Sequence, residues 1–295
     1  MEYSVEAVKP LGCGDTLLVL DYGLPCDELK KLRRPGQLLV IIDHHRAPPP
    51  ESREPGVLYC NPVSMGAGGE DEWPATSLLL YRITGKYPDL ALLGVLGDRP
   101  DATSNLRSLV DELSEASGVE PSTAKLAAEM LDSCYRRLDY ACIERSVGLL
   151  AASGISGVLG DERLRRSMRE VEEELRAALD NTRCREVEDS GVLYCETELN
   201  NPLHTLIGRR LACRNKGSIV VLVARVKKLN DTIIYVRSVT RSPGKLLDKA
   251  RALVKAECPW ASIGGKERVF AVEKLGGCRV DRVVSRLLRL LAEEA

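Results

Sequence analysis

The chain has 295 residues, of which 44% are hydrophobic and 29% are charged, and its formal net charge is −1. This length leaves room for two domains, and the near-zero charge argues against a surface devoted to nucleic acid. No apolar run approaches the roughly 18 residues that a membrane-spanning helix needs, and the first residues, MEYSVEAVKP, lack a signal-peptide pattern. We therefore expect a cytoplasmic globular protein without a membrane partner.

The ten cysteines are scattered singly along the chain, and no two form a C-x-x-C pair. A zinc ribbon is therefore not expected, and buried free thiols are the default interpretation in a cytoplasmic protein. Disulfides are expected only if the source is a hyperthermophile. The single glutamine, Gln37, the abundant arginine and the many charged helices hint at a thermophilic origin.

Three short apolar runs dominate the first hundred residues: TLLVLD (16–21), QLLVIID (37–43) and ALLGVLGD (91–98). Runs that are apolar on both faces are typical of parallel strands buried between helices. The segment PATSLLLYRITG (74–85) predicts a helix that begins near Thr76 or Ser77. The pattern indicates an α/β fold with a parallel sheet flanked by helices.

Each of these runs ends in an aspartate, Asp21, Asp43 or Asp98, and His44 and His45 follow the second run directly. Ligands of open α/β sheets bind beyond the carboxyl ends of the strands, so these side chains are expected to converge there. Carboxylates and imidazoles together suit Mn²⁺ or a similar divalent ion. The alternative is that Asp43 caps the following turn and that both histidines are ordinary polar residues.

Residues 102–180 are predicted to be helical, and the charged segment DERLRRSMREVEEELRAALDN carries an apolar stripe and ends near Asn181. From about residue 185 the pattern returns to strands, SIVVLVARVKK (218–228) and TIIYVRSVTRS (232–242). LIGRRLACR, GKLLDKARALVKAE and DRVVSRLLRLLAEEA are predicted helices, and SIGGKE is predicted to be a glycine turn. A second, smaller α/β domain follows from this pattern.

The ordered motifs LLVLDYG, VIIDHH and LLGVLGDR resemble those of the DHH phosphoesterase superfamily, most closely its RecJ-like branch. CNPVS and the helix after GGEDEWPATS are similar to the segment that follows the DHH signature in archaeal RecJ-like proteins. LIGRRLA, VRSVTRS and IGGKERVFAV resemble the DHH-associated domain. The resemblance implies a DHH domain (residues 1–160), a connector helix with its linker (161–184) and a DHH-associated domain (185–295).

The resemblance also implies roles for individual residues. Asp21 would be the metal ligand of the second motif, Asp43, His44 and His45 would form the third motif, and Asp98 the fourth. A phosphate-binding face in the second domain is implied for a further set, Arg241, Ser242, Gly264, Gly265 and Lys266. Any bound metal would be Mn²⁺ or Mg²⁺.

The sequence departs from the family pattern in two places. No Asp-x-Asp-Gly turn precedes Asp21, and Lys266 occupies the position of the family's substrate-contacting histidine. A lysine can hold a phosphate as a point charge but cannot act as a neutral imidazole donor. We therefore expect no catalytic residues and no required cofactor: Asp43 and His45 would be vestigial, and Asp21, His44 and Asp98 would form at most a partial metal site.

By this resemblance the chain looks like an inactive archaeal replication protein, a relative of the RecJ-derived subunit of the CMG helicase. Its expected partners are the GINS complex, the MCM helicase through the replisome, and single-stranded DNA. The alternative is an active Mn²⁺-dependent single-strand exonuclease or phosphodiesterase. A small-molecule sensor that uses the second domain's glycine loop is a third possibility.

Overall fold

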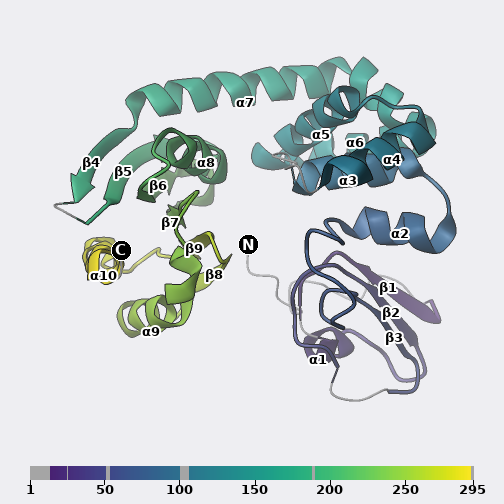
Figure 1. Ribbon diagram of the computed structural model, residues 1–295, viewed down its shortest axis with the longest axis horizontal. Coiled ribbons are helices and arrows are strands. Elements are labelled where there is room, and N and C mark those ends of the chain that lie inside the picture. Colours follow the sequence, from purple (N-terminus) through teal and green to yellow (C-terminus); the bar gives the residue numbers. More distant parts are fainter. Residues whose placement is uncertain (1–13, 25, 51–53, 100–105, 188–189, 294–295) are drawn as a thin grey trace. The chain divides into compact units, whose positions relative to one another are not determined.

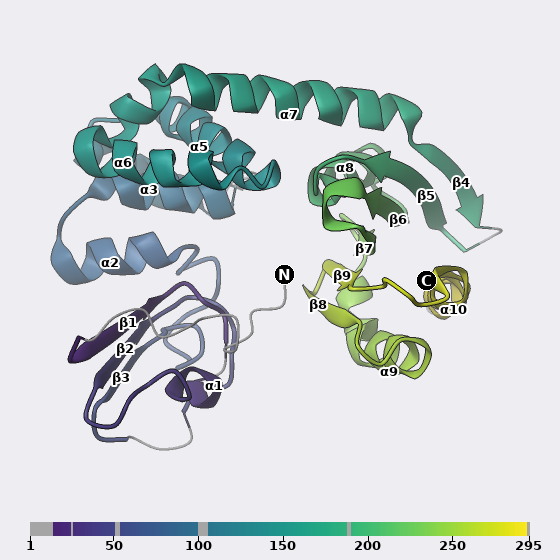
Figure 2. The same ribbon diagram turned by 180° about the vertical axis from the view of Figure 1, so that it is seen from behind.

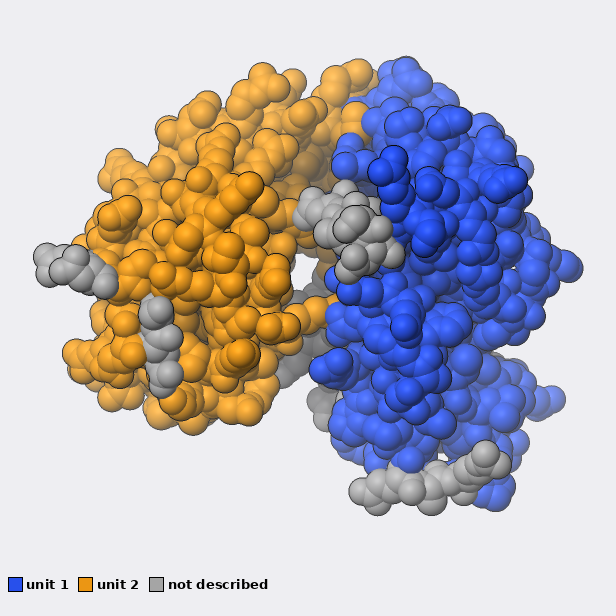
Figure 3. Space-filling model, viewed as in Figure 1, with its two compact units in different colours: residues 1–132, 140–165 blue, residues 133–139, 166–295 orange. Residues whose placement is uncertain are grey.

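The computed structural model describes residues 14–24, 26–50, 54–99, 106–187 and 190–293 (Figure 1). The chain forms two compact units, residues 1–132 with 140–165 and residues 133–139 with 166–295 (Figure 3). The first unit contains a three-stranded sheet and the second a six-stranded sheet. The fold is therefore the expected α/β class.

The sheet of the first unit is entirely parallel, in the order β1-β2-β3. Its strands are β1 (Thr16–Leu20), β2 (Leu38–Ile42) and β3 (Val57–Cys60). The short helix α1 (Cys26–Lys30) packs on one face, where it forms a core with alternate strand residues such as Leu39 and Ile41. The first two strands were expected from the sequence, whereas β3 was not.

The remaining elements of this unit are helices. They are α2 (Thr76–Thr84), α3 (Pro88–Asp98), α4 (Arg107–Ser117), α5 (Pro121–Arg136, whose last turn belongs to the second unit) and α6 (Tyr140–Gly160). The start of α2 at Thr76 agrees with the sequence. The prediction of a strand over residues 91–98 was wrong, because this run lies inside α3. A continuous apolar run does not distinguish a buried strand from a buried helix, and here Pro88 at the first helical position favours the helix.

One helix, α6, is long and apolar enough to span a membrane by length and composition alone, contrary to the expectation of no such stretch. Buried core helices of soluble proteins pass the same test, but most of this segment of α6 is exposed. The backbone of α6 also breaks at Gly154, whose φ of 58° and ψ of −150° are not helical. The break divides α6 into two helices that are each shorter than the roughly 20 residues needed to cross a bilayer.

The second unit is built on a sheet in the order β4-β5-β6-β7-β9-β8, with β4 at one edge and β8 at the other (Figure 2). Its strands are β4 (Arg183–Val187), β5 (Val192–Leu199), β6 (Ile219–Val226), β7 (Asp231–Arg237), β8 (Ser262–Lys266) and β9 (Val269–Glu273). Two 3₁₀ turns, η3 (Lys227–Leu229) and η4 (Pro243–Leu246), follow β6 and β7.

Helices cover both faces of this sheet. They are α7 (Glu162–Asn181), α8 (His204–Arg214), α9 (Leu247–Glu257) and α10 (Val280–Glu293). One core holds Val171 and Leu175 of α7 with Ile207 of α8, and the core on the opposite face holds Val254 of α9 and Leu287 of α10. The helix predicted to end near Asn181 is α7. The predicted glycine turn SIGGKE was wrong: it is largely the edge strand β8, and the turn comes after it.

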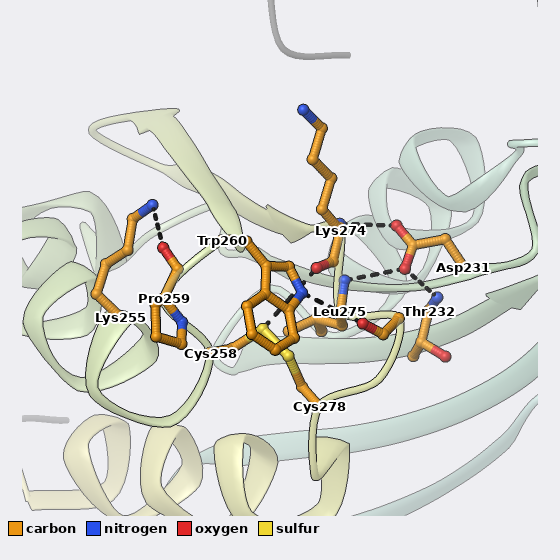
Figure 4. The surroundings of a disulfide bond; sticks show 10 residues. Asp231, Thr232, Lys255, Cys258, Pro259, Trp260, Lys274, Leu275 and Cys278 are labelled. Carbon is orange, nitrogen blue, oxygen red and sulfur yellow. Dashed lines mark hydrogen bonds between the residues drawn. A yellow bond between two sulfur atoms is a disulfide. The ribbon is translucent and has the colours of Figure 1, made fainter.

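Cysteine pairing also differs from the expectation of isolated thiols. Cys184 is bonded to Cys195, and Cys258 is bonded to Cys278. The first pair lies directly opposite across β4 and β5, and the second joins the residue after α9 to the segment before α10 (Figure 4). Partners that are 11 and 20 residues apart meet only through the tertiary fold, so the search for C-x-x-C spacing could not detect them.

Candidate metal centre

The candidate metal centre lies at the carboxyl ends of β1 and β2 in the first unit. Asp21 directly follows β1, and His44 and His45 follow β2 after Asp43. Ligand atoms of Asp21, His44 and His45 all lie within 4.8 Å of one another. Parallel strands carry successive chain segments to the same edge of the sheet, which is why residues more than twenty positions apart meet here.

Asp21 occupies a tight turn, and its φ of 56° lies in the left-handed region. Among non-glycine residues, aspartate and asparagine tolerate this conformation best. The hydroxyl of Thr76, the first residue of α2, donates a hydrogen bond of 2.8 Å to Oδ1 of Asp21. Hydrogen bonding with His44 lowers the pKa of Asp21 and outweighs the opposing effect of burial, with a further contribution from Thr76. The carboxylate is therefore held ionised and aimed at the histidines.

The imidazole of His44 is buried, and a contact on the side of the ring away from Asp21 fixes its orientation. Nδ1 lies 3.1 Å from the carbonyl oxygen of Trp73. A carbonyl only accepts, so Nδ1 carries the proton and, in the neutral ring, Nε2 keeps the lone pair. Nε2 lies 3.4 Å from Oδ1 of Asp21 and 3.5 Å from Oδ2 of Asp98.

This arrangement fits a divalent cation. In the neutral ring, the lone pair of His44 faces oxygens of Asp21 and Asp98, which are themselves acceptors, and a cation among them would be bound by all three. A ring N–H that donates to a carbonyl is the usual support of a metal-binding histidine. Mixed carboxylate and imidazole donors suit Mn²⁺ better than soft metals. Asp21, His44, His45 and Asp98 are the residues that would hold the ion.

Asp98 reaches the centre from α3, not from a strand, because the run that contains it is helical. It is the last residue of that helix, and its carboxylate approaches Nε2 of His44. The expected proximity of Asp98 to His44 therefore arises from a different element than the sequence suggested.

Asp43 plays a different part, because its carboxylate is buried and fully engaged. Oδ2 accepts the backbone N–H of Gly23 at 2.8 Å, and Oδ1 accepts the backbone N–H groups of His44 and His45. Oδ1 also lies 2.8 Å from Nδ1 of His45. Burial raises the pKa of Asp43, but the hydrogen bonds from His45 and Gly23 outweigh it and leave the pKa lowered. Asp43 thus caps the turn and orients His45.

The backbone of His45 is fixed from the opposite side by Asn61 and Ser64. The side-chain amide of Asn61 donates to the carbonyl of His45 at 2.8 Å, and the hydroxyl of Ser64 donates to the same oxygen at 3.2 Å. Gly23 makes room for the imidazole, since a Cβ there would lie 3.3 Å from Cγ of His45. The supporting roles of Gly23, Thr76 and the Trp73 carbonyl were not predicted. The one signal in the sequence was Thr76, a hydroxyl-bearing residue at the predicted start of a helix that follows the strands.

The predicted phosphate-binding residues lie in the second unit. Gly264, Gly265 and Lys266 belong to the edge strand β8. The N–H of Gly244 donates to the carbonyl of Glu267 at 2.8 Å, which brings the loop after Ser242 against the end of β8. The hydroxyl of Ser242 donates to Oε1 of Glu267, so a phosphate bound by Ser242 would have to displace this acid.

Arg241 lies in the same loop, but its guanidinium packs over Gly191, just before β5. A Cβ at Gly191 would come within 2.7 Å of Nη2 of Arg241. Nη1 of Arg241 and Nε of Arg237 are buried and have no hydrogen-bond partner among the described residues. The structure thus brings the loop of Ser242 against the residue that follows Lys266, and donor atoms of Arg237 and Arg241 are buried without a hydrogen-bond partner among the described residues.

Comparison with known proteins by sequence finds no matching family and no matching curated protein. Solved structures do match over nearly the whole chain. The DHH domain of a member of a family of ribosomal proteins aligns with a TM-score of 0.63 at 17% identity, covering 94% of this chain and 68% of that one. RecJ from Thermus thermophilus, in complex with Mn²⁺, aligns with a TM-score of 0.53 at 20% identity, covering 94% of this chain and 45% of that one. The chain therefore has the fold of DHH-domain proteins and spans less than half of the RecJ structure.

Proposed function

We propose that this chain is a RecJ-like DHH protein that binds a single divalent cation and does not hydrolyse nucleic acid. In this proposal it is a scaffold of an archaeal replisome related to the CMG helicase, where it binds GINS and single-stranded DNA. The observation that carries the proposal is the composition of the candidate metal centre.

Hydrolysis with two metal ions requires ligands for two ions held a few ångströms apart. Among the described residues, Asp21, His44 and His45 form the one group of three such side chains that could hold a metal. Asp98 adds a carboxylate beside His44. The carboxylate of Asp43 already accepts four hydrogen bonds that cap the turn, so we do not count it as a metal ligand. This donor set supports one ion better than two.

The DNA-binding part of the proposal draws on the second unit. Phosphate contacts are made by arginine, lysine and backbone N–H groups and need no particular base sequence. One donor atom each of Arg237 and Arg241 is buried without a hydrogen-bond partner among the described residues, so a change of side-chain conformation that brought it to a phosphate oxygen would satisfy it. The overall charge of −1 favours a protein that meets DNA within an assembly over one that binds it alone.

The test combines a Mn²⁺ titration followed by calorimetry with a nuclease assay on 5′-labelled single-stranded DNA. We expect one bound ion per chain, no cleavage, and loss of binding in Asp21→Asn. Asp15→Asn is the matched control, since Asp15 is an exposed acid just before β1. Mn²⁺-dependent cleavage that Asp21→Asn abolishes and Asp15→Asn preserves would overturn the inactive assignment.

Such cleavage would establish the second candidate, an active Mn²⁺-dependent exonuclease or phosphodiesterase. The observation in its favour is the convergence of Asp21, His44 and Asp98 within a fold shared with Mn²⁺-bound RecJ.

The scaffold assignment has its own test, which is independent of catalysis. The chain is mixed with recombinant GINS from the same source and analysed by size-exclusion chromatography with light scattering. Co-elution at a fixed molar ratio is expected. Separate elution at concentrations of about 10 μM would exclude a GINS complex with a Kd in the low micromolar range or below.

A further inference from the structure

One face of the β1-β2-β3 sheet is apolar and partly exposed, since Ile42 on this face is buried whereas its leucines are not. Register places Leu18 beside Val40 and Val40 beside Leu58, and these three side chains point to the face opposite α1. Leu20 lies on the same face, one row further along. Leu18, Leu20 and Leu58 are 53%, 40% and 58% exposed. Parallel sheets almost always have both faces covered, so this exposure needs an explanation.

The open face continues into a cavity beside α2. Cys60 lies two residues after Leu58 on β3 and therefore points to the same face. It lines a cavity of about 330 Å³. Met65 and Ile83 also line this cavity and are 60% and 58% exposed. We call Leu18, Leu20, Leu58, Met65 and Ile83 together the leucine face.

The composition of the leucine face indicates what could cover it. None of its five residues is charged, and the one charged residue that lines the adjoining cavity, Arg82, is paired with Glu112, so an oppositely charged partner would not be selected here. The chain as a whole carries a net charge of −1, so two copies repel each other little. The exposed side chains of the leucine face lie next to the cavity that Cys60 lines. In a dimer with two-fold symmetry, the exposed side chains of each copy could therefore pack into the cavity of the other copy.

The exposed apolar area of the leucine face is also large enough for a protein–protein interface. The five side chains expose on the order of 500 Å² of mostly apolar surface, a size at which patches on monomers are often interaction sites. Two such faces brought together would bury about 1,000 Å² in total, the lower bound for a specific interface.

We propose that the leucine face is the interface of a symmetric dimer of this chain. The two sheets pack face to face, and Leu58 lies near the centre of the contact because it stands between the leucines of β1 and the cavity.

Sedimentation velocity over a range of concentrations up to about 100 μM tests the proposal. The wild-type chain is expected to sediment as a dimer at the upper end of this range. Leu58→Asp buries a charge at the centre of the interface and is expected to weaken association at least about 100-fold. Leu58 is mostly exposed, so the variant should keep the fold, which circular dichroism verifies.

Tyr140→Asp is the matched control. Tyr140, at the start of α6, is 74% exposed and lies outside the leucine face, so the variant loses a similar apolar side chain and gains the same charge. It is expected to dimerise like the wild type. A wild-type chain that stays monomeric up to the highest concentration overturns the proposal, and so does a Leu58→Asp variant that still dimerises.

Hydrogen exchange provides a second readout that does not depend on any variant. Amides of β1 and β3 are expected to exchange at least about threefold more slowly at high than at low protein concentration, while those of β4 remain unchanged. Equal slowing in β4, or none in β1 and β3, would place the contact elsewhere and contradict the proposal.

Discussion

Nε2 of His44 lies 3.4 Å from Oδ1 of Asp21, while Nδ1 of the same ring lies 3.1 Å from the carbonyl oxygen of Trp73. The second contact fixes the tautomer, and the first therefore sets a lone pair of the neutral ring against a carboxylate. In the neutral ring neither group donates a hydrogen bond to the other, whereas the protonated ring would donate Nε2–H to Asp21, which is the interaction that lowers the pKa of Asp21. The pair is arranged for a cation, and Asp21 and Asp43 should consequently respond very differently to substitution.

Asp21→Asn should abolish metal binding without destabilising the fold. Half of the Asp21 side chain is exposed, and asparagine tolerates its left-handed backbone conformation. Oδ1 of asparagine can still accept the hydrogen bond from Thr76. We expect the affinity for Mn²⁺ to fall at least about 100-fold, and the free energy of unfolding to change by less than about 0.5 kcal/mol.

Calorimetric titration with Mn²⁺ and urea unfolding of the metal-free protein measure the two quantities. A loss of stability in the metal-free variant would show that Asp21 is a structural residue. Asp21→Ala is a poorer choice for this test, because alanine tolerates the left-handed conformation less well and adds strain of its own.

Asp43→Asn should do the reverse and destabilise the protein itself. Asp43 is 2% exposed, and its two oxygens accept the backbone N–H groups of Gly23, His44 and His45 as well as Nδ1 of His45. An amide retains one accepting oxygen and turns an N–H group toward the remaining donors. We expect a loss of about 2–3 kcal/mol in the free energy of unfolding, measured in urea.

The same variant should also weaken Mn²⁺ binding, by about tenfold, because the ring of His45 loses its orienting partner. Asp15→Asn serves as the control, because it removes an exposed acid at the opposite end of β1, and it should change neither quantity. Unaltered stability in Asp43→Asn would mean that the cap contributes nothing to the turn.

The sequence predicted the centre better than it predicted the elements that build it. The ends of β1 and β2 were recognisable because their apolar runs stop at Asp21 and Asp43, and strand ends in parallel sheets share an edge. Asp98 was assigned to a third strand, whereas it ends α3, and the true third strand is the four-residue β3. A run such as ALLGVLGD is apolar all round, so it has no periodicity by which helix and strand could be separated.

Glycine misled the prediction in the second unit. Gly264 and Gly265 suggested a turn, but they pair with Ala271 and Phe270 in the ladder between β8 and β9. A Cβ at Gly265 would approach the carbonyl oxygen of Val269 to 2.3 Å, so this glycine permits close approach of the backbone. Such a requirement comes from the neighbouring strand, which a local pattern does not reveal.

Reduction of the Cys258–Cys278 disulfide should destabilise the second unit. The bond closes a loop of 20 residues between the end of α9 and the start of α10. By loop-closure entropy, this cross-link stabilises the folded state by about 3 kcal/mol. The double variant Cys258→Ala with Cys278→Ala should lose a similar amount, seen as a lower urea midpoint for the second unit.

The loop retains other contacts that limit the damage. The carboxylate of Asp231 accepts the N–H groups of Lys274 and Leu275, and the indole of Trp260 donates to the carbonyl of Gly276 (Figure 4). The variant should therefore remain folded at 25 °C. Cys213→Ala, which removes an exposed free thiol, is the control and should leave the midpoint unchanged. An unchanged midpoint in the double variant would contradict the prediction.

His204 should make the second unit sensitive to acid. Burial, which disfavours the charged imidazolium, lowers the pKa of His204 to about 4, and the opposing influence of Glu273 does not compensate. Between pH 6.5 and 4 the unfolded chain therefore binds a proton that the folded chain does not. The stabilising effect is complete above about pH 6.5 and is lost progressively as the pH falls toward 4.

Comparison of urea unfolding at pH 7.5 and pH 5 isolates this contribution. Linkage gives a loss of about 2 kcal/mol at pH 5 from His204 alone. His204→Phe keeps an aromatic ring against Tyr235, which packs edge-on to the imidazole, and removes the titrating group. The variant should show a pH dependence smaller by about 2 kcal/mol, while His45→Gln, in the first unit, should leave the unfolding of the second unit unaffected. Equal pH dependence in wild type and His204→Phe would show that the imidazole is charged or solvated in the folded state.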